Sequence, residues 1–149
     1  MASFNNNNRN HRPSGEFGRA PQQSKAPEAA PDFPADYVDF AEKLMREQYR
    51  NITTSKLRNI LSLLMDVYNT ETLRTDGTIS EDSAVKLQLA RIRIAYECGR
   101  DRTTKEFVAA ANLLPWLKAV GNSRPQALCY IHYLEALVAY HRFFGGREN

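Results

Sequence analysis

The sequence contains no long apolar run and only two cysteines among its 149 residues. Its longest uninterrupted apolar stretches, such as 63–65 and 109–111, fall far short of the roughly 18 residues that a membrane-spanning helix needs. The first ten residues carry no apolar core of a secretory signal, so we expect a cytoplasmic protein with no membrane partner. In that reducing compartment we expect Cys98 and Cys129 to remain small buried thiols without a disulfide.

Residues that would support enzymatic chemistry are also scarce. Cys129, His132 and Glu135 follow one another at helical spacing, but a zinc site needs three or four ligands and no second Cys/His pair completes one. A di-iron bundle needs an E-x-x-H motif on each of two helices, and the sequence contains none. No nucleophile stands in an elbow motif, and no phosphate-loop lysine follows Gly145-Gly146. We therefore expect no catalytic residue, no metal and no cofactor.

Composition divides the chain at about residue 34. Residues 1–34 hold five of the seven prolines, an Asn run at 5–8 and few large apolar residues. Such a segment cannot bury enough apolar surface to offset its ordering entropy. We predict a disordered Asn/Pro-rich tail over 1–34, followed by one helical domain over 35–149.

The remainder shows helical periodicity and no sustained strand-like alternation. It predicts an all-α fold, a compact bundle of about five helices. Pro115 lies inside the fourth expected helix and predicts a kink or break near Leu114. Cap candidates predict where four of the helices begin, because a side-chain oxygen there accepts a free backbone N–H. The first helix is expected over about 34–50, and the later starts are Thr53–Ser55, Ser80, Thr103 and Ser123.

The expected third helix has two apolar stripes on roughly opposite sides. One stripe consists of Val85, Leu89, Ile92 and Tyr96, and the other of Leu87, Ile94 and Cys98. This pattern predicts a helix that packs on two sides. Between the stripes, Lys86, Arg93 and Arg100 form a line of cations at a spacing of seven, which fits either a solvated face or a surface that tracks nucleic-acid phosphates.

The last expected helix, over 124–144, is apolar around most of its circumference. A helix of this composition is typical of the centre of a bundle or of a protein interface. We predict that it serves as both.

Three strings of the sequence carry a family resemblance. They are Thr-Thr-Ser-Lys-Leu-Arg-Asn-Ile-Leu at 53–61, Ala-Tyr-Glu-Cys-Gly-Arg-Asp at 95–101, and Leu-Glu-Ala-Leu-Val-Ala-Tyr-His-Arg-Phe-Phe-Gly-Gly at 134–146. Together, over about residues 49–146, they resemble the small helical subunit of type III-A CRISPR effectors, the Csm complex. The long Asn/Pro-rich start departs from that family.

The resemblance implies a non-catalytic subunit of an antiviral ribonucleoprotein. Several copies are expected to stack in a filament beside the repeated backbone subunit, along the groove where target RNA pairs with guide RNA. The nuclease and the large polymerase-like subunit are separate chains. Because guide pairing already reads the sequence, contacts to RNA phosphates without sequence readout suffice.

The same resemblance points to RNA-binding residues. Basic positions of the family strings are implied to face RNA, which carries over to Lys56, Arg58 and Arg100. The charge pattern on the helical faces, together with the resemblance, adds Arg91, Arg93 and Arg142 as further RNA-binding candidates.

Two alternatives remain open from the residues alone. A helical DNA-binding transcriptional regulator would use the second helix as a recognition helix, with residues 50–55 as the turn before it. Against it, that helix offers few side chains that read base edges besides Arg58, Asn59 and Asn69. A small enzyme with a metal on the last helix is the other alternative.

Overall fold

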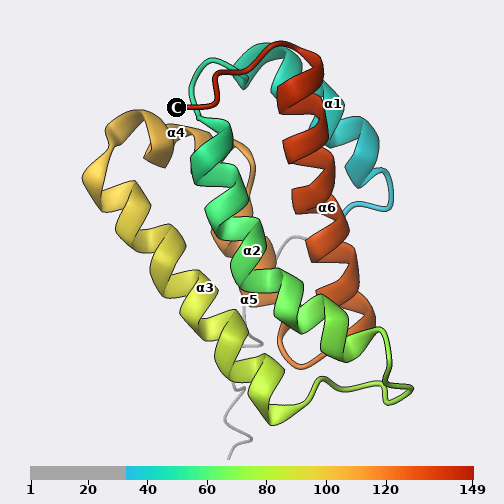
Figure 1. The fold of residues 1–149 in the computed structure, drawn as a ribbon. Coiled ribbons are helices and arrows are strands. Elements are labelled where there is room, and N and C mark those ends of the chain that lie inside the picture. The colour runs from blue at the N-terminus through green and yellow to red at the C-terminus, as the bar shows by residue number, and fades with distance from the viewer. Residues whose placement is uncertain (1–32) are drawn as a thin grey trace, which may run out of the picture.

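The computed structural model describes residues 33–149, which form helices and no strand (Figure 1). This confirms the predicted all-α fold, with six helices where about five were expected. The disordered tail predicted over 1–34 lies outside the described residues except for its last two positions. The helices are α1 Tyr37–Gln48, α2 Thr54–Glu71, α3 Glu81–Arg100, α4 Arg102–Ala110, α5 Leu113–Val120 and α6 Arg124–Phe143.

Three of the four predicted helix starts are confirmed by their cap geometry. The side-chain oxygens of Thr53, Ser80 and Ser123 each accept a hydrogen bond from the backbone N–H three residues later. The fourth is wrong, because Asp101 and not Thr103 caps α4. The Asp101 carboxylate accepts the Thr103 backbone N–H at 3.0 Å, so Thr103 already lies inside the helix.

The sixth helix arises because the fourth predicted helix breaks at Ala111–Asn112, three residues before the predicted position near Leu114. Asn112 has a φ of 54°, in the left-handed region that ends a helix. A new helix starts directly afterwards and places Pro115 in its first turn. The first four N–H groups of a helix have no partner within it, so a proline costs little there.

Two buried tyrosines of α6 satisfy the backbone at this break. In an unbroken helix the N–H of residue 115 would bond to the carbonyl of Ala111, but Pro115 has no N–H. The Tyr133 hydroxyl donates to that carbonyl instead, at 2.9 Å. The Tyr130 hydroxyl likewise donates to the carbonyl of Leu113 at 2.8 Å. The tyrosines therefore hold the α4–α5 corner against the central helix.

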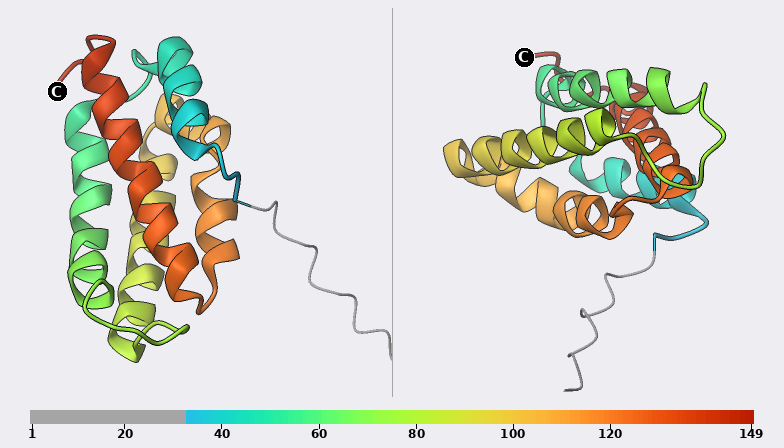
Figure 2. Two further views of the ribbon diagram at one scale, coloured as in Figure 1. Left: turned by 90° about the vertical axis from the view of Figure 1, so that its right-hand side faces the viewer. Right: turned by 90° about the horizontal axis from the view of Figure 1, so that it is seen from below.

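Helix α6 occupies the centre of the bundle, as predicted, and packs against α1, α2 and α5 (Figure 2). Helix α2 also packs on α3, and α3 rests on α4 and α5. The buried face of α2 includes Leu57, Ile60, Leu64 and Val67. None of the helices within 33–149 combines the length and the hydrophobicity that crossing a membrane requires.

An aromatic cluster joins the beginning of the described chain to α5 and α6. The ring centroids of Phe33 and Phe40 lie 5.1 and 5.3 Å from that of Trp116, in edge-on arrangements. Trp116 in turn meets Tyr133 at 5.0 Å. Edge-on aromatic pairs at these distances add stability beyond simple burial. The packed structure therefore includes Phe33.

Helix α3 packs on one side only within residues 33–149, so the prediction that it packs on two sides is wrong for this part of the chain. Leu87 and Ile94 are buried, at 5% and 0% exposure. The opposite stripe consists of Val85, Leu89, Ile92 and Tyr96, each more than half exposed. The physical reason is that α2, α4 and α5 all approach α3 from one side.

Candidate nucleic-acid interface

The three strings that carry the family resemblance meet at one end of the bundle (Figure 1). The first begins α2, the second ends α3, and the third ends α6, after which the chain folds back onto the start of α2. The backbone N–H of Thr54 donates to the carbonyl of Arg147 at 2.8 Å, and that of Ser55 to the carbonyl of Glu148 at 3.0 Å. The C-terminal residues therefore satisfy N–H groups that the first turn of α2 leaves free.

A fully buried histidine secures this contact. His141 Nε2 lies 2.7 Å from the carbonyl oxygen of Ile52 and therefore donates, while Nδ1 lies 3.0 Å from the Thr54 hydroxyl. Gly146 packs so closely on the imidazole that an added Cβ would lie 2.2 Å from it. His141 and Gly146 of the third string therefore have a structural role, because they secure the contact between the C-terminal residues and the start of α2.

Lys56, one of the predicted RNA-binding residues, has partners within the protein. Its ammonium lies 2.6 Å from the Asp101 carboxylate and 2.9 Å from the Thr104 hydroxyl. The hydrogen bond from Lys56, with a second from Thr104, lowers the pKa of Asp101 from 3.8 to about 2. Lys56 therefore joins the start of α2 to the α3–α4 junction, and its contact with RNA stays a prediction.

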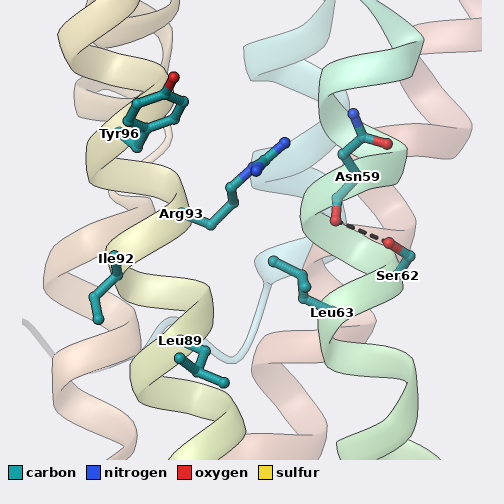
Figure 3. A pocket seen from close by; sticks show the side chains of 7 residues that line it. All are labelled: Asn59, Ser62, Leu63, Leu89, Ile92, Arg93 and Tyr96. Atoms are coloured by element: carbon teal, nitrogen blue, oxygen red, sulfur yellow. Dashed lines mark hydrogen bonds between the residues drawn. The ribbon is translucent and has the colours of Figure 1, made fainter.

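A groove of about 610 Å³ runs between α2 and α3 (Figure 3). The exposed stripe of α3 forms one wall, and the Arg93 side chain extends across the groove toward α2. The lining residues are Asn59, Ser62 and Leu63 from α2, and Leu89, Ile92, Arg93 and Tyr96 from α3. The groove is thus aliphatic along the first part of α3 and aromatic and cationic toward its end.

Two of the predicted arginines flank the aromatic ring of the groove. The guanidinium carbons of Arg93 and Arg100 lie 5.9 and 5.5 Å from the centroid of Tyr96, within cation–π range. Both arginines also approach the Glu97 carboxylate, at 3.4 and 4.0 Å. The Glu97 side chain is only 10% exposed. Two half-exposed cations therefore share one nearly buried acid, and the surface there is positive.

Arg58 adds a third exposed cation beside the groove. It precedes Ser62 by one helical turn and so lies along the same edge of α2. Within residues 33–149 it has no ion-pair partner. Of the predicted residues, the structure therefore brings Arg93 and Arg100 together around Tyr96, and it leaves Arg58 exposed on the facing helix α2.

The remaining predicted cations lie elsewhere. Arg91 faces the α5 side of α3, where it lines a small hollow with Lys118. Arg142 stands at the end of α6 and pairs with the Glu148 carboxylate. The line of cations at a spacing of seven is also divided, because Lys86 lies 3.1 Å from Asp82 and 3.9 Å from a carboxylate of α2.

Sequence reasoning missed the role of Tyr96 in this site. It assigned Tyr96 to an apolar stripe, although the residue follows Arg93 by three positions and precedes Arg100 by four. That spacing places all three side chains on one helical face. This spacing was present in the sequence, but Tyr96 was interpreted only as part of an apolar stripe.

The possible metal ligands of the last helix show a simple pair. His132 Nδ1 lies 3.1 Å from the Glu135 carboxylate, and both side chains are partly exposed. In the part of the chain that the structure describes, no group of three or more His, Cys, Asp or Glu side chains is placed to hold a metal ion. Cys98 and Cys129 are both free thiols.

Comparison with known proteins decides the family. The model of the family described as Csm2 Type III-A matches residues 33–147, almost all of the helical domain. The chain belongs to the Csm2 family. This confirms the resemblance and makes the protein a small subunit of a type III-A CRISPR effector complex, which contains other Csm subunits.

Curated Csm2 proteins agree with this assignment. The chain is 36% identical over 123 residues to the CRISPR system Cms protein Csm2 of Enterococcus italicus, covering 72% of this chain and 88% of that protein. It is 32% identical over 118 residues to the protein of the same name from Mycobacterium tuberculosis, covering 76% and 95%. The corresponding Streptococcus thermophilus protein is 31% identical over 119 residues, covering 76% and 94%.

The Csm2 assignment also weighs against the transcriptional-regulator alternative. A helix-turn-helix unit needs its two helices to pack on each other across a short turn. Here the main contacts of α1 and of α2 are both with α6, so the two helices belong to the bundle and do not form a separate reading unit.

Proposed function

We propose that this Csm2-family subunit contacts the guide and target RNA of its complex along the groove between α2 and α3. Arg58, Arg93 and Arg100 neutralise phosphates there, without reading the base sequence. The observation that supports this role most directly is that Arg93 lines the groove and shares the almost buried Glu97 with the exposed Arg100. The exposed Arg58 lies one turn before the groove residue Ser62 on the facing helix α2. Clustered arginines are the usual means of binding a phosphate backbone.

The other RNA-binding candidates contribute less in this proposal. Lys56 and Arg142 each pair with a carboxylate of their own, whereas Arg93 and Arg100 share the single carboxylate of Glu97. Arg91 lies on the side of α3 that faces α5. A cation that is held in an ion pair must separate from its carboxylate before it can neutralise a phosphate fully. We therefore expect substitutions at these three positions to weaken RNA retention less than substitutions beside the groove.

The subunit also stacks in several copies beside the repeated backbone subunit, and it supplies no catalytic group. In this role it works in the cytoplasm, in antiviral defence, alongside the large polymerase-like subunit. Large apolar side chains left exposed by the bundle support stacking, because such residues mark protein contacts when they gather on one surface. They include Val85, Leu89 and Ile92 on the exposed stripe of α3, and Phe143, which is 74% exposed at the end of α6.

The RNA proposal is tested by a double substitution beside the groove. Arg58→Ala with Arg100→Ala should weaken retention of target RNA by the purified complex at moderate salt, for every sequence alike. The slope of the salt dependence should fall by about 0.7 for each single-strand phosphate that is no longer neutralised. Lys43→Ala with Lys118→Ala is the matched control, since it removes the same charge from positions away from the groove.

Three results would count against the proposal. Equal RNA retention by the double variant and the control would mean that the groove cations do not touch RNA. Loss of the helical circular dichroism signal in the double variant would mean that these arginines are needed for folding. A change for one RNA sequence and not another would mean that the protein reads bases, as a regulator does.

A further inference from the structure

Tyr96 differs from the other large aromatic residues of the bundle in being both exposed and flanked by cations. Tyr130 and Tyr133 are completely buried, whereas Tyr96 is 55% exposed at the cationic end of the groove. The guanidinium groups of Arg93 and Arg100 come from the preceding and following turns of α3 and lie against the same ring. The ring is thus supported on the helix while part of its surface faces the groove.

We propose that Tyr96 is a stacking platform for an unpaired base of an RNA strand, with Arg93 and Arg100 neutralising the phosphates beside that nucleotide. The inference rests on the proposed function, because it names the kind of RNA that the same groove receives. Aromatic rings beside arginines are the recurring means of holding single-stranded RNA, since every base offers a flat π-face.

The ligand must be a nucleotide that has left a continuous helix. A base within a paired duplex has both faces covered by its neighbours, so a side chain has no face on which to stack. The Tyr96 platform therefore serves a nucleotide that is unpaired or displaced from the duplex. This adds a contact with a base, though not a reading of its identity, to the phosphate contacts already proposed.

The facing wall of the groove suits a base of any identity. Asn59 carries both a donor and an acceptor in its side-chain amide, so it accommodates different base edges. The Ser62 hydroxyl already donates to the Asn59 backbone carbonyl at 2.9 Å, as Figure 3 shows, which leaves its oxygen as an acceptor. Neither group enforces one base, in agreement with binding that ignores sequence.

Charge separates the Tyr96 end of the groove from its aliphatic end. At the aliphatic end Lys86 is paired with exposed carboxylates of Asp82 and Asp66. At the Tyr96 end two arginines share a single acid, whose side chain is 10% exposed. Complementarity to a polyanion is therefore confined to the end that holds the ring, which favours RNA over a protein partner there.

Photocrosslinking tests the platform directly. The probe is a target RNA in which uridines are replaced by 5-iodouridine, whose base crosslinks on irradiation to an aromatic side chain stacked on it. The complex is purified through a tag on the full chain, loaded with this RNA, irradiated and digested with trypsin. We expect an RNA adduct on Tyr96, in the peptide 94–100. Absence of an adduct from that peptide overturns the proposal.

Matched variants give a second readout. Tyr96→Phe keeps the ring and should retain both the adduct and RNA affinity. Tyr96→Leu keeps the bulk without the π-face, and should lose the adduct and weaken RNA retention about 5-fold or more, the scale of one base–aromatic stack. Abasic sites are then placed in the target RNA one position at a time, and a site at the nucleotide that stacks on Tyr96 should abolish the difference between the two variants.

The outcomes separate this inference from the function on which it rests. If Arg58→Ala with Arg100→Ala weakens RNA retention but Tyr96→Leu does not, the platform is wrong and the phosphate contacts stand. If neither variant has an effect, the proposed function fails as well. If Tyr96→Leu fails to enter the complex while the free subunit binds RNA as before, the ring contacts a protein and the proposal is overturned.

Discussion

Leu87 and Leu89 lie two residues apart on α3, but their surroundings are opposite. Leu87 is 5% exposed and belongs to the core, whereas Leu89 is 54% exposed and lines the groove. The two faces of the helix carry similar apolar residues, so composition does not distinguish them. The face that meets α2, α4 and α5 stabilises the subunit, and the face that meets no helix within 33–149 is available to the rest of the complex.

The difference shows how to separate folding residues from assembly residues in this subunit. Substitutions on the buried face should lower the free energy of unfolding, and substitutions on the exposed face should change binding without changing stability. The same comparison applies to other pairs of residues, in which one residue makes contacts within the fold and the matched residue does not.

The largest expected effect contrasts the two leucines. Leu87→Ala should lower the free energy of unfolding by about 2 to 3 kcal/mol, because it removes buried methyl groups and leaves a cavity. Leu89→Ala should change it by less than about 0.5 kcal/mol, as is usual for surface positions. Urea unfolding of both variants measures the difference. Equal losses would show that the exposed face is covered in the free subunit.

The next effect contrasts two glycines near the end where the strings meet. Gly146→Ala places a methyl group 2.2 Å from the buried His141 ring and should cost about 1 to 3 kcal/mol, the range for overpacking. Gly99→Ala, on α3, meets nothing within 4 Å and should stabilise the helix by up to about 1 kcal/mol. Thermal unfolding followed by circular dichroism distinguishes them, and a neutral Gly146→Ala would mean that the C-terminal contact is dispensable.

A smaller effect contrasts two tyrosines. Tyr133→Phe removes the donor to the Ala111 carbonyl and should cost about 1 to 2 kcal/mol, because that buried acceptor is left unpaired. Tyr96→Phe should leave stability unchanged, because the ring is exposed and keeps its contacts with both arginines. Chemical unfolding of the two variants is the measurement. A neutral Tyr133→Phe would require another donor at the α4–α5 break.

The smallest effect concerns the ion pair of Lys56 on α2 with Asp101 at the end of α3, and it depends on pH. The folded-state pKa of Asp101, about 2, lies below its ordinary value of 3.8. Its interactions therefore stabilise the fold fully above pH 3.8, and this contribution is lost as the pH falls from 3.8 toward 2. Lys56→Met should lower the melting temperature slightly at neutral pH and by less at pH 2.

Lys43→Met serves as the control for that experiment, because Lys43 has no ion pair within residues 33–149. Its melting temperature should follow the unmodified protein across the same pH range. Indistinguishable acid profiles for Lys56→Met and the unmodified protein would show that Asp101 is held by its other hydrogen bonds alone.

Local chemistry explains which parts of the fold were predictable. Thr53, Ser80 and Ser123 were identified as helix starts because a cap needs only an oxygen and an N–H three residues away. The break at Ala111–Asn112 lies earlier than predicted, and the Ala111 carbonyl there is paired with Tyr133, which lies 22 residues further along the chain. Pro115 predicted an interruption just before it, but not how many residues earlier the helix would end.

The candidate site was likewise predictable from the sequence only in part. The family resemblance and the basic residues on the helical faces predicted Arg58, Arg93 and Arg100 as RNA-binding residues from the sequence, and their contact with RNA stays a prediction. The same reasoning grouped Lys56 with them, although its partner Asp101 is 45 positions away and becomes a neighbour only when α2 meets the α3–α4 junction. It also missed the groove, which exists only because α2 and α3 lie side by side.

The sequence by itself determined the helical fold, the starts of three of the six helices, the central place of α6 and the Csm2 family, because each depends on patterns within one segment or on strings of residues. Tertiary structure alone decided which side of α3 is buried and where Tyr96 lies. Both sides of α3 are apolar enough to be a core face, so burial depends on where the other helices pack. That position is set by contacts between residues far apart in the chain, which no local pattern records.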